Sequence, residues 1–175
     1  TQGVSSAASD VYKRQGCMNV FLDTEFTDFL DPHLISLGMA SEYGEDFYAE
    51  VPYPDCACST FVREVVVPLL RKIPHSYVTI DNLHLEIIKW LEIVRRNKEE
   101  VFICVDSHTD WDLFCKALDC RVPPWCNYKI VSNEIVELML YDFFKHSGLP
   151  EHHALYDAQA NRHAYRPHPP KNNNQ

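Results

Sequence analysis

The feature that most constrains the fold is one amphipathic helix pattern followed closely by a short, fully apolar run. The helix pattern covers Asn82–Arg96, and its hydrophobic residues recur at helical spacing with polar residues opposite. These hydrophobic residues are Leu83, Ile87, Leu91 and Val94. The apolar run Val101–Val105 predicts a buried strand. The chain therefore combines at least one surface helix with one buried strand.

Shorter patterns complete this layout. Further strands are predicted at Asn19–Leu22, Leu34–Ala40 and Asp46–Val51, the last two joined by a turn that contains Gly44. Further helices are predicted at Phe61–Leu70 (broken near Pro68), Asp110–Leu118, Asn133–His146 (ended by Gly148 and Pro150) and Leu155–Tyr165. A strand meander followed by helix, strand and helices predicts an α/β fold with a central mixed β-sheet flanked by helices.

The length and the ends of the chain predict one folded domain. The 175 residues are 46% hydrophobic, which suits a single domain over residues 18–165. We expect residues 1–17 to be a disordered leader and residues 166–175 a disordered tail, because both are polar and lack periodicity. Ser9–Gln15 resembles translated linker sequence, which makes Met18 a candidate start. No apolar run is long enough to cross a bilayer and no signal peptide is visible, so we expect a cytoplasmic protein without a membrane partner.

The seven cysteines predict free thiols. Their number is odd and their spacing irregular, and paired C-x₂-C half-sites are missing, which disfavours both a disulfide framework and a structural zinc site. Cys104 lies in an apolar run and is expected in the core.

The net charge of −9 argues against a simple clamp on duplex nucleic acid. An acidic chain can act on nucleic acid if some carboxylates hold divalent metal ions and the substrate is gripped locally, near an end.

The first candidate site motif is Asp23-Thr24-Glu25. If it ends the first strand, Asp23 and Glu25 project from the same face, because side chains two apart in a strand do so. Two carboxylates held close repel each other unless a proton or a cation intervenes, and hard oxygen ligands suit magnesium or manganese. The alternative is a solvated strand end, since Asp-x-Glu is common by chance.

The second motif is His152-His153-Ala154-Leu155-Tyr156-Asp157. Residues five apart on a helix differ by about 140° of rotation. His152 and Asp157 can therefore share a site only if the histidine lies in the loop before the helix. An exposed surface histidine is the alternative.

Three aspartates after the apolar strand, Asp106, Asp110 and Asp112, compete for one further role. Asp110 and Asp112 would point to different sides of the predicted helix. We select Asp110, which falls at the helix start where carboxylates are favoured, with Asp112 as the second choice.

Taken in order, these motifs resemble the DEDD 3′–5′ exonucleases, in the subgroup whose third motif has histidine (DEDDh). Phe21–Phe26 followed by Leu34–Gly38 is similar to a compact bacterial group of 3′–5′ exoribonucleases. The resemblance spans residues 18 to about 165 and implies a ribonuclease H-like exonuclease domain. Many members have His-Asn and an aromatic residue before the second-motif aspartate, whereas this chain has Ser107-His108-Thr109.

The resemblance implies two-metal phosphodiester hydrolysis with Mg²⁺ or Mn²⁺. In that scheme Asp23 bridges two ions, Glu25 and Asp157 complete one of them, and Asp110 supports the other. His152 would be the general base, and the product would be a nucleoside 5′-monophosphate.

The implied substrate is single-stranded RNA or a 3′ overhang, with DNA as the alternative. Phe26 and Thr24 are the predicted substrate contacts, Phe26 by stacking or else as a core residue, whereas Phe29 is expected in the core. A binding module that has lost the chemistry and a structural zinc protein are rival interpretations. A homodimer is possible, but no interface is identifiable in the sequence.

Overall fold

The computed structural model describes residues 16–167 as one mixed β-sheet with helices on both faces. Its strands are β1 (Cys17–Phe26), β2 (Leu34–Ser41), β3 (Asp46–Glu50), β4 (Glu100–Val105) and β5 (Cys126–Ile130). They lie in the order β3-β2-β1-β4-β5. β1, β2 and β3 pair antiparallel, while β4 runs parallel to β1 and β5 parallel to β4. The predicted α/β fold with a central mixed sheet is confirmed.

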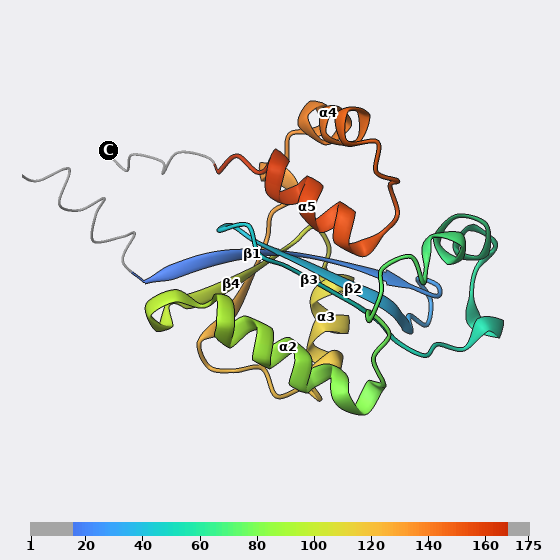
Figure 1. Cartoon of the computed structure of the whole chain (residues 1–175), viewed down its shortest axis with the longest axis horizontal. Coiled ribbons are helices and arrows are strands. Elements are labelled where there is room, and N and C mark those ends of the chain that lie inside the picture. The colour runs from blue at the N-terminus through green and yellow to red at the C-terminus, as the bar shows by residue number, and fades with distance from the viewer. Residues whose placement is uncertain (1–15, 168–175) are drawn as a thin grey trace, which may run out of the picture.

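The helices cover the two faces of this sheet in pairs (Figure 1). They are α2 (Ile80–Val94), α3 (His108–Ala117), α4 (Glu137–Ser147) and α5 (Ala154–Ala164). α2 and α3 lie on one face, and α5 lies on the other with α4 outside it. Short turns of helix occur at Asp55–Ala57, Val62–Val66, Val67–Leu69, Arg96–Lys98 and Ser132–Glu134.

Strand β1 is central and presents different chemistry to each face. Met18, Val20 and Leu22 are buried in the main core with residues of α2 and α3. Phe21 belongs to a separate cluster on the other face. Because side chains alternate along a strand, Asp23 and Glu25 follow Phe21 onto the α5 face.

Gly38 on β2 allows α5 to lie close against the sheet. It pairs with Asp23 across the β1–β2 ladder. A Cβ atom at position 38 would overlap the backbone of Ala154 and Leu155, at the start of α5. The absence of a side chain therefore lets the first turn of α5 come directly over the strand that carries Asp23.

Two predicted helices are wrong in detail. The pattern Asn133–His146 is interrupted, because Ile135 is extended and bridges Tyr165, so that α4 begins only at Glu137. It ends as predicted at Gly148, whose φ of 67° is left-handed. The pattern Phe61–Leu70 forms a single π-helical turn and then a short 3₁₀ turn, since Pro68 cannot donate a backbone hydrogen bond.

One strand, β5, was not predicted. Four of its five residues are exposed or half-buried, and it lies at the edge of the sheet. Such a strand lacks the apolar run or clear alternation by which strands are recognised in a sequence.

The chain ends and the cysteines complete the description. Residues 1–15 and 168–175 of the expected leader and tail lie outside the described residues. Cys17 already belongs to β1, and the Arg166 amide donates to the Glu134 carbonyl, so both expected boundaries are wrong by one or two residues. All seven thiols are free, and Cys104 is buried as predicted.

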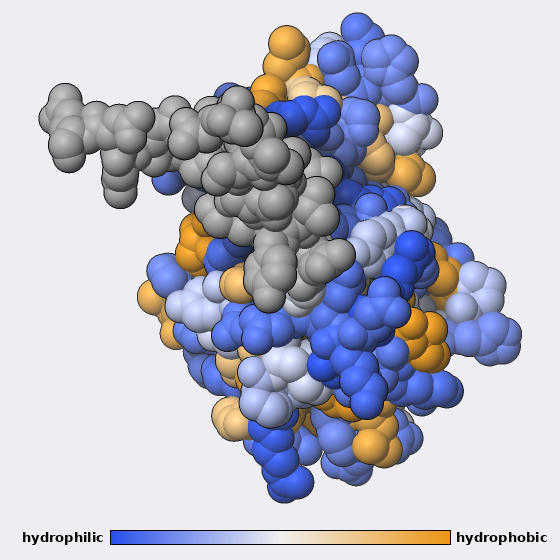
Figure 2. All heavy atoms as spheres, turned by 90° about the vertical axis from the view of Figure 1, so that its left-hand side faces the viewer, coloured by the Kyte–Doolittle hydropathy of each residue, from blue (hydrophilic) through white to orange (hydrophobic). Residues whose placement is uncertain are grey.

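Two surface properties concern possible membrane or partner contacts. In residues 16–167, no helix combines the length and the hydropathy needed to cross a membrane. The end of the molecule where β1 begins is mainly hydrophilic, and its hydrophobic residues are scattered (Figure 2).

Candidate active site

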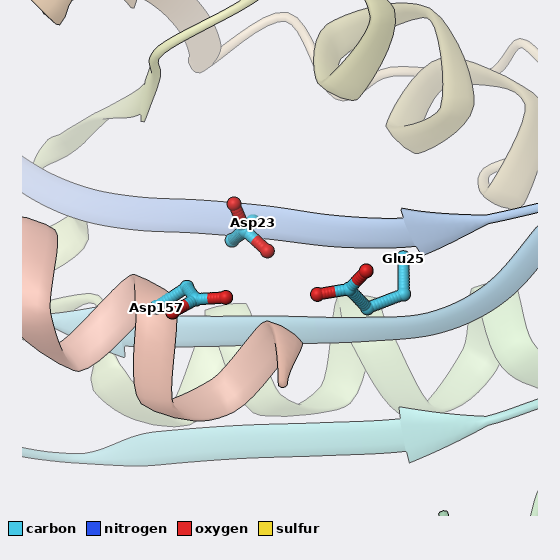
Figure 3. Close-up of side chains that lie close together, drawn as sticks. All are labelled: Asp23, Glu25 and Asp157. Atoms are coloured by element: carbon cyan, nitrogen blue, oxygen red, sulfur yellow. The ribbon is translucent and has the colours of Figure 1, made fainter. Parts of the chain in front are cut away.

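Three carboxylates converge between β1 and α5. Oxygen atoms of Asp23, Glu25 and Asp157 all lie within 4.8 Å of one another. The three side chains point toward a common centre, two from β1 and one from α5 (Figure 3). They line a cavity of about 920 Å³, which is within the usual size of a small-ligand site.

The electrostatics of this group favour a bound cation. Burial, followed by the charges of Asp157 and Asp110, raises the pKa of Asp23 well above its usual value. The same causes raise the pKa of Glu25 to about 8. Burial raises the pKa of Asp157 to about 7. Like charges held this close are stable only with protons or a cation between them, and oxygen ligands suit a hard divalent ion. The donor set therefore fits a divalent metal.

Asp157 is held in place by the start of its own helix. It lies in the first turn of α5, and its Oδ2 accepts a hydrogen bond of 3.1 Å from the amide of His153, the N-cap residue. The His153 ring is buried between Tyr48 and Tyr156, with ring-centroid distances of 4.5 and 4.0 Å. Burial lowers the pKa of His153 to about 4, so the ring is neutral at pH 7. Sequence reasoning gave His153 no positioning role, because histidine is not among the residues preferred at the N-cap of a helix.

Asp110 is fixed by two other side chains. Its Oδ1 accepts hydrogen bonds from the Thr24 hydroxyl at 2.6 Å and the Thr24 amide at 3.2 Å. Its Oδ2 accepts from the Ser107 hydroxyl at 2.5 Å. Ser107 is also the N-cap of α3, so Ser107-x-x-Asp110 forms a capping arrangement that was available in the sequence.

These bonds define what Asp110 and Thr24 do in the described structure. Asp110 is buried and lines the cavity, but it does not belong to the group of three carboxylates within metal range. Thr24 is buried and its hydroxyl donates to Asp110, so the observed role of Thr24 is to hold the Asp110 carboxylate in place. Metal support by Asp110 and substrate contact by Thr24 stay predictions.

The structure also distinguishes Asp106 and Asp112, the two aspartates that compete with Asp110. Asp112 is exposed on α3 and does not line the cavity. This agrees with the expectation that Asp110 and Asp112, two residues apart, point to different sides of the helix. Asp106 also lines the cavity and is exposed. Partial desolvation there, followed by the charge of Asp110, raises the pKa of Asp106 to about 6. Asp106, which was named as a candidate but not selected, is thus a further acidic residue of the cavity.

His152 lies in the loop before α5, as the spacing required. It lines the same cavity as Asp157 and is exposed. Its φ of 61° is left-handed, a conformation uncommon outside glycine that is often found at functional sites. Its ring contacts Phe61 edge to face at a centroid distance of 5.0 Å.

Five aromatic side chains line the same cavity as the carboxylates: Phe26, Phe29, Phe61, Tyr141 and Phe144. The prediction that Phe29 is a core residue is wrong, since its side chain is 83% exposed. It follows the end of β1 in a loop and contacts Phe26 edge to face at 5.0 Å. Phe26 is half-buried and lines the cavity.

No protein-family model matches this sequence, and no curated protein matches it either. Solved structures do match. The nuclease domain of 3′hExo, a DEDDh family member bound to rAMP, has a TM-score of 0.55 and 14% identity, over 85% of this chain and 90% of that one. Cell-death related nuclease 4 (CRN-4) has a TM-score of 0.56 and 16% identity, over 83% of this chain and 62% of that one.

A third structure, of a 3′-exonuclease recognising the 3′ end of a histone mRNA stem-loop, has a TM-score of 0.54 and 14% identity over 93% of this chain and 72% of that one. At such identities these matches establish the fold that this chain shares with DEDDh nuclease domains. The finer likeness to compact bacterial exoribonucleases stays a prediction.

Proposed function

We propose that this chain is a DEDDh-type, metal-dependent 3′–5′ exonuclease that removes nucleoside 5′-monophosphates from single-stranded RNA. The observation that carries the proposal is the convergence of Asp23, Glu25 and Asp157 within 4.8 Å, in a cavity that His152 also lines. A site of this composition, with aromatic side chains lining the same cavity, suits a phosphodiester attached to a planar base.

The descriptions of two structural neighbours support RNA as the substrate and a 3′ end as the point of attack. One is described as bound to rAMP and another as recognising the 3′ end of an mRNA stem-loop. Both descriptions name RNA, and the second names a 3′ end. They favour RNA over DNA and a 3′ terminus over an internal bond for this chain.

Each residue has a distinct role in the proposed reaction. Asp23, Glu25 and Asp157 hold the divalent ions, which when bound supply an activated water and stabilise charge on the phosphate. His152 accepts the proton of the attacking water. Phe26 stacks on the terminal base and orients the last phosphodiester over the carboxylates.

Asp110 contributes through its fixed position. Because Thr24 and Ser107 hold both of its oxygens, Asp110 keeps its position beside Asp23 and Glu25 without having to reorganise. A carboxylate has about four lone-pair positions, so it can still bind an ion through water.

The test is cleavage of 5′-labelled single-stranded RNA and of its DNA counterpart in Mg²⁺, in Mn²⁺ and in EDTA. We expect metal-dependent shortening from the 3′ end, faster for RNA, which Asp23→Asn abolishes. Asp112→Asn is the matched control, because Asp112 is exposed and outside the cavity. Internal cuts, EDTA-resistant cleavage or full activity of Asp23→Asn would refute the proposal, and faster cleavage of DNA would refute its RNA preference.

A further inference from the structure

A row of three polar residues crosses the sheet on its α5 face and begins in the carboxylate group. Ser36 on β2 is paired with Glu25 on β1 and with Glu50 on β3. Directly paired residues share one face of the sheet, and their Cβ atoms lie about 4.5–5.5 Å apart. The Ser36 side chain is therefore next to one carboxylate of the site and to one carboxylate outside it.

The Ser36 hydroxyl is buried without a hydrogen-bond partner. Its side chain is 1% exposed, and its Oγ atom has no partner among residues 16–167. A buried hydroxyl left unpaired costs free energy, and each such group in a folded protein calls for an explanation. Ser36 does not line the cavity, so any effect on the reaction passes through a neighbouring side chain.

Of the two neighbouring carboxylates, Glu50 already has its own donors. It is 3% exposed, accepts a hydrogen bond from the Tyr48 hydroxyl at 3.0 Å, and its two oxygens accept from the Arg71 amide at 2.8 and 3.1 Å. The Tyr48 hydroxyl is also a neighbour of Ser36, but its only proton is donated to Glu50. Glu50 is thus engaged in holding Tyr48 and the chain at Arg71.

Glu25 lacks what Ser36 can supply. Asp110 and Asp157 each accept hydrogen bonds that hold them in place, whereas Glu25 accepts none from the described residues. The β1–β2 ladder becomes irregular directly after the Glu25–Ser36 pair, between Glu25 and Phe26. Irregularities of this kind re-aim side chains and are frequent beside active sites. A donor without an acceptor and an acceptor without a donor therefore lie side by side.

Given the proposed function, on which this inference rests, we propose that Ser36 is a positioning residue for the metal site. Its hydroxyl donates to Glu25 and holds that carboxylate in the orientation in which it binds an ion. A carboxylate can bind an ion through one oxygen and accept a hydrogen bond through the other, and loss of such a supporting bond commonly weakens metal binding about 10- to 100-fold. Ser36 thus serves Glu25 as Thr24 and Ser107 serve Asp110.

The experiment measures the Kd for Mn²⁺ by calorimetry and the Tm in EDTA for the wild type, Ser36→Ala and Ser41→Ala. Ser41 is the matched control, because it is a fully buried serine of the same strand whose hydroxyl donates to Glu45, at the β2–β3 turn. Ser36→Ala should raise the Kd about tenfold and leave the Tm in EDTA unchanged or higher, since the hydroxyl that it removes is unpaired in the metal-free protein. Ser41→Ala should lower the Tm and leave the Kd unchanged.

A third variant, Tyr48→Phe, tests which neighbour Ser36 acts through. It keeps the ring that stacks on His153 and removes the hydroxyl that donates to Glu50. The Kd for Mn²⁺ should stay close to the wild-type value, because the Tyr48 hydroxyl does not hold Glu25.

The outcomes separate this inference from the proposed function. An unchanged Kd in Ser36→Ala, an equal rise in Kd in Tyr48→Phe, or a Tm in EDTA that falls as far in Ser36→Ala as in Ser41→Ala would overturn the role of Ser36 and leave the metal site intact. If the wild type binds no Mn²⁺, the proposed function fails and the role of Ser36 fails with it.

Discussion

The two faces of strand β1 share one backbone and have opposite chemistry. On the α2–α3 face, Met18, Val20 and Leu22 are fully buried among hydrophobic side chains. On the α5 face, Asp23 and Glu25 meet Asp157, and burial raises the pKa of all three. The first face lowers the free energy of folding by removing apolar area from water, whereas the second raises it by crowding carboxylates. The two-residue alternation of one strand therefore divides stability and function between its two faces.

The largest expected effect is on activity, at the α5 face. Asp23→Asn should lower kcat by on the order of 10³-fold or more, because it removes a carboxylate that holds the metal ions. The metal-free variant should be at least as stable as the wild type, since one crowded charge is gone. Kinetics and thermal unfolding in EDTA check both parts. A variant that loses stability and activity together would break the division between the faces.

Leu22, which precedes Asp23 on β1, should show the opposite pattern, with a loss of stability and little change in activity. Leu22→Ala should lower the free energy of unfolding by about 2–5 kcal/mol, as expected for a buried leucine that leaves a cavity. Activity per folded molecule should change little at a temperature where the variant is folded. Urea denaturation gives the stability, and a loss of kcat as large as that of Asp23→Asn would contradict the comparison.

Gly38→Ala should affect both properties, because Gly38 determines how close α5 lies to β1. A methyl group there would overlap the backbone of Ala154 and Leu155. Overpacking of this kind costs about 1–3 kcal/mol, and any shift of α5 moves Asp157 away from Asp23. We expect lower stability together with weaker metal binding, measured by unfolding and by Mn²⁺ titration. The control is Gly44→Ala in the β2–β3 turn, where nothing lies within 4 Å, and which should change stability only.

The stability of the metal-free protein should fall as the pH rises from about 4 to 8. The folded-state pKa values of Glu25 and Asp157 are about 8 and about 7, above their usual values near 4. In that window the folded state binds more protons than the unfolded state, so the free energy of unfolding decreases with pH. Each kcal/mol corresponds to about 2–4 °C in Tm for a domain of this size.

The measurement is Tm in EDTA across this pH range for the wild type and Asp157→Asn, and then at pH 8 with added Mn²⁺. The variant should show a shallower decrease, and Mn²⁺ should restore the Tm of the wild type. Parallel curves for the two proteins would show that Asp157 is not under electrostatic strain.

The smallest effect is expected at Thr24, which lies on the core side of β1 and yet supports the site. Thr24→Val keeps the shape and removes the hydroxyl that donates to Asp110. The loss should be about 1 kcal/mol of stability and a few-fold in kcat. A change in kcat as large as that of Asp23→Asn would mean that Thr24 contacts the substrate directly, as the sequence first suggested.

The sequence was informative wherever local periodicity decides the structure. The alternation along β1 placed Asp23 and Glu25 on one face, and the helical spacing around Asp157 required His152 to lie in a loop. Both follow from backbone geometry alone. The strand β5 and the break at Ile135 were missed because edge pairing and a bridge to Tyr165 depend on distant parts of the chain. The exposure of Phe29 and the approach of α5 to Gly38 are likewise tertiary properties.

The most direct test of the central claim is Mn²⁺ binding to the purified protein, measured by calorimetry with and without 5′-AMP. We expect saturable binding by the wild type, two ions per chain when the nucleotide is present, loss of binding in Asp23→Asn, and unchanged binding in Asp112→Asn. Absence of binding by the wild type, or equal binding by Asp23→Asn, would contradict the claim that the α5 face of β1 is a metal site.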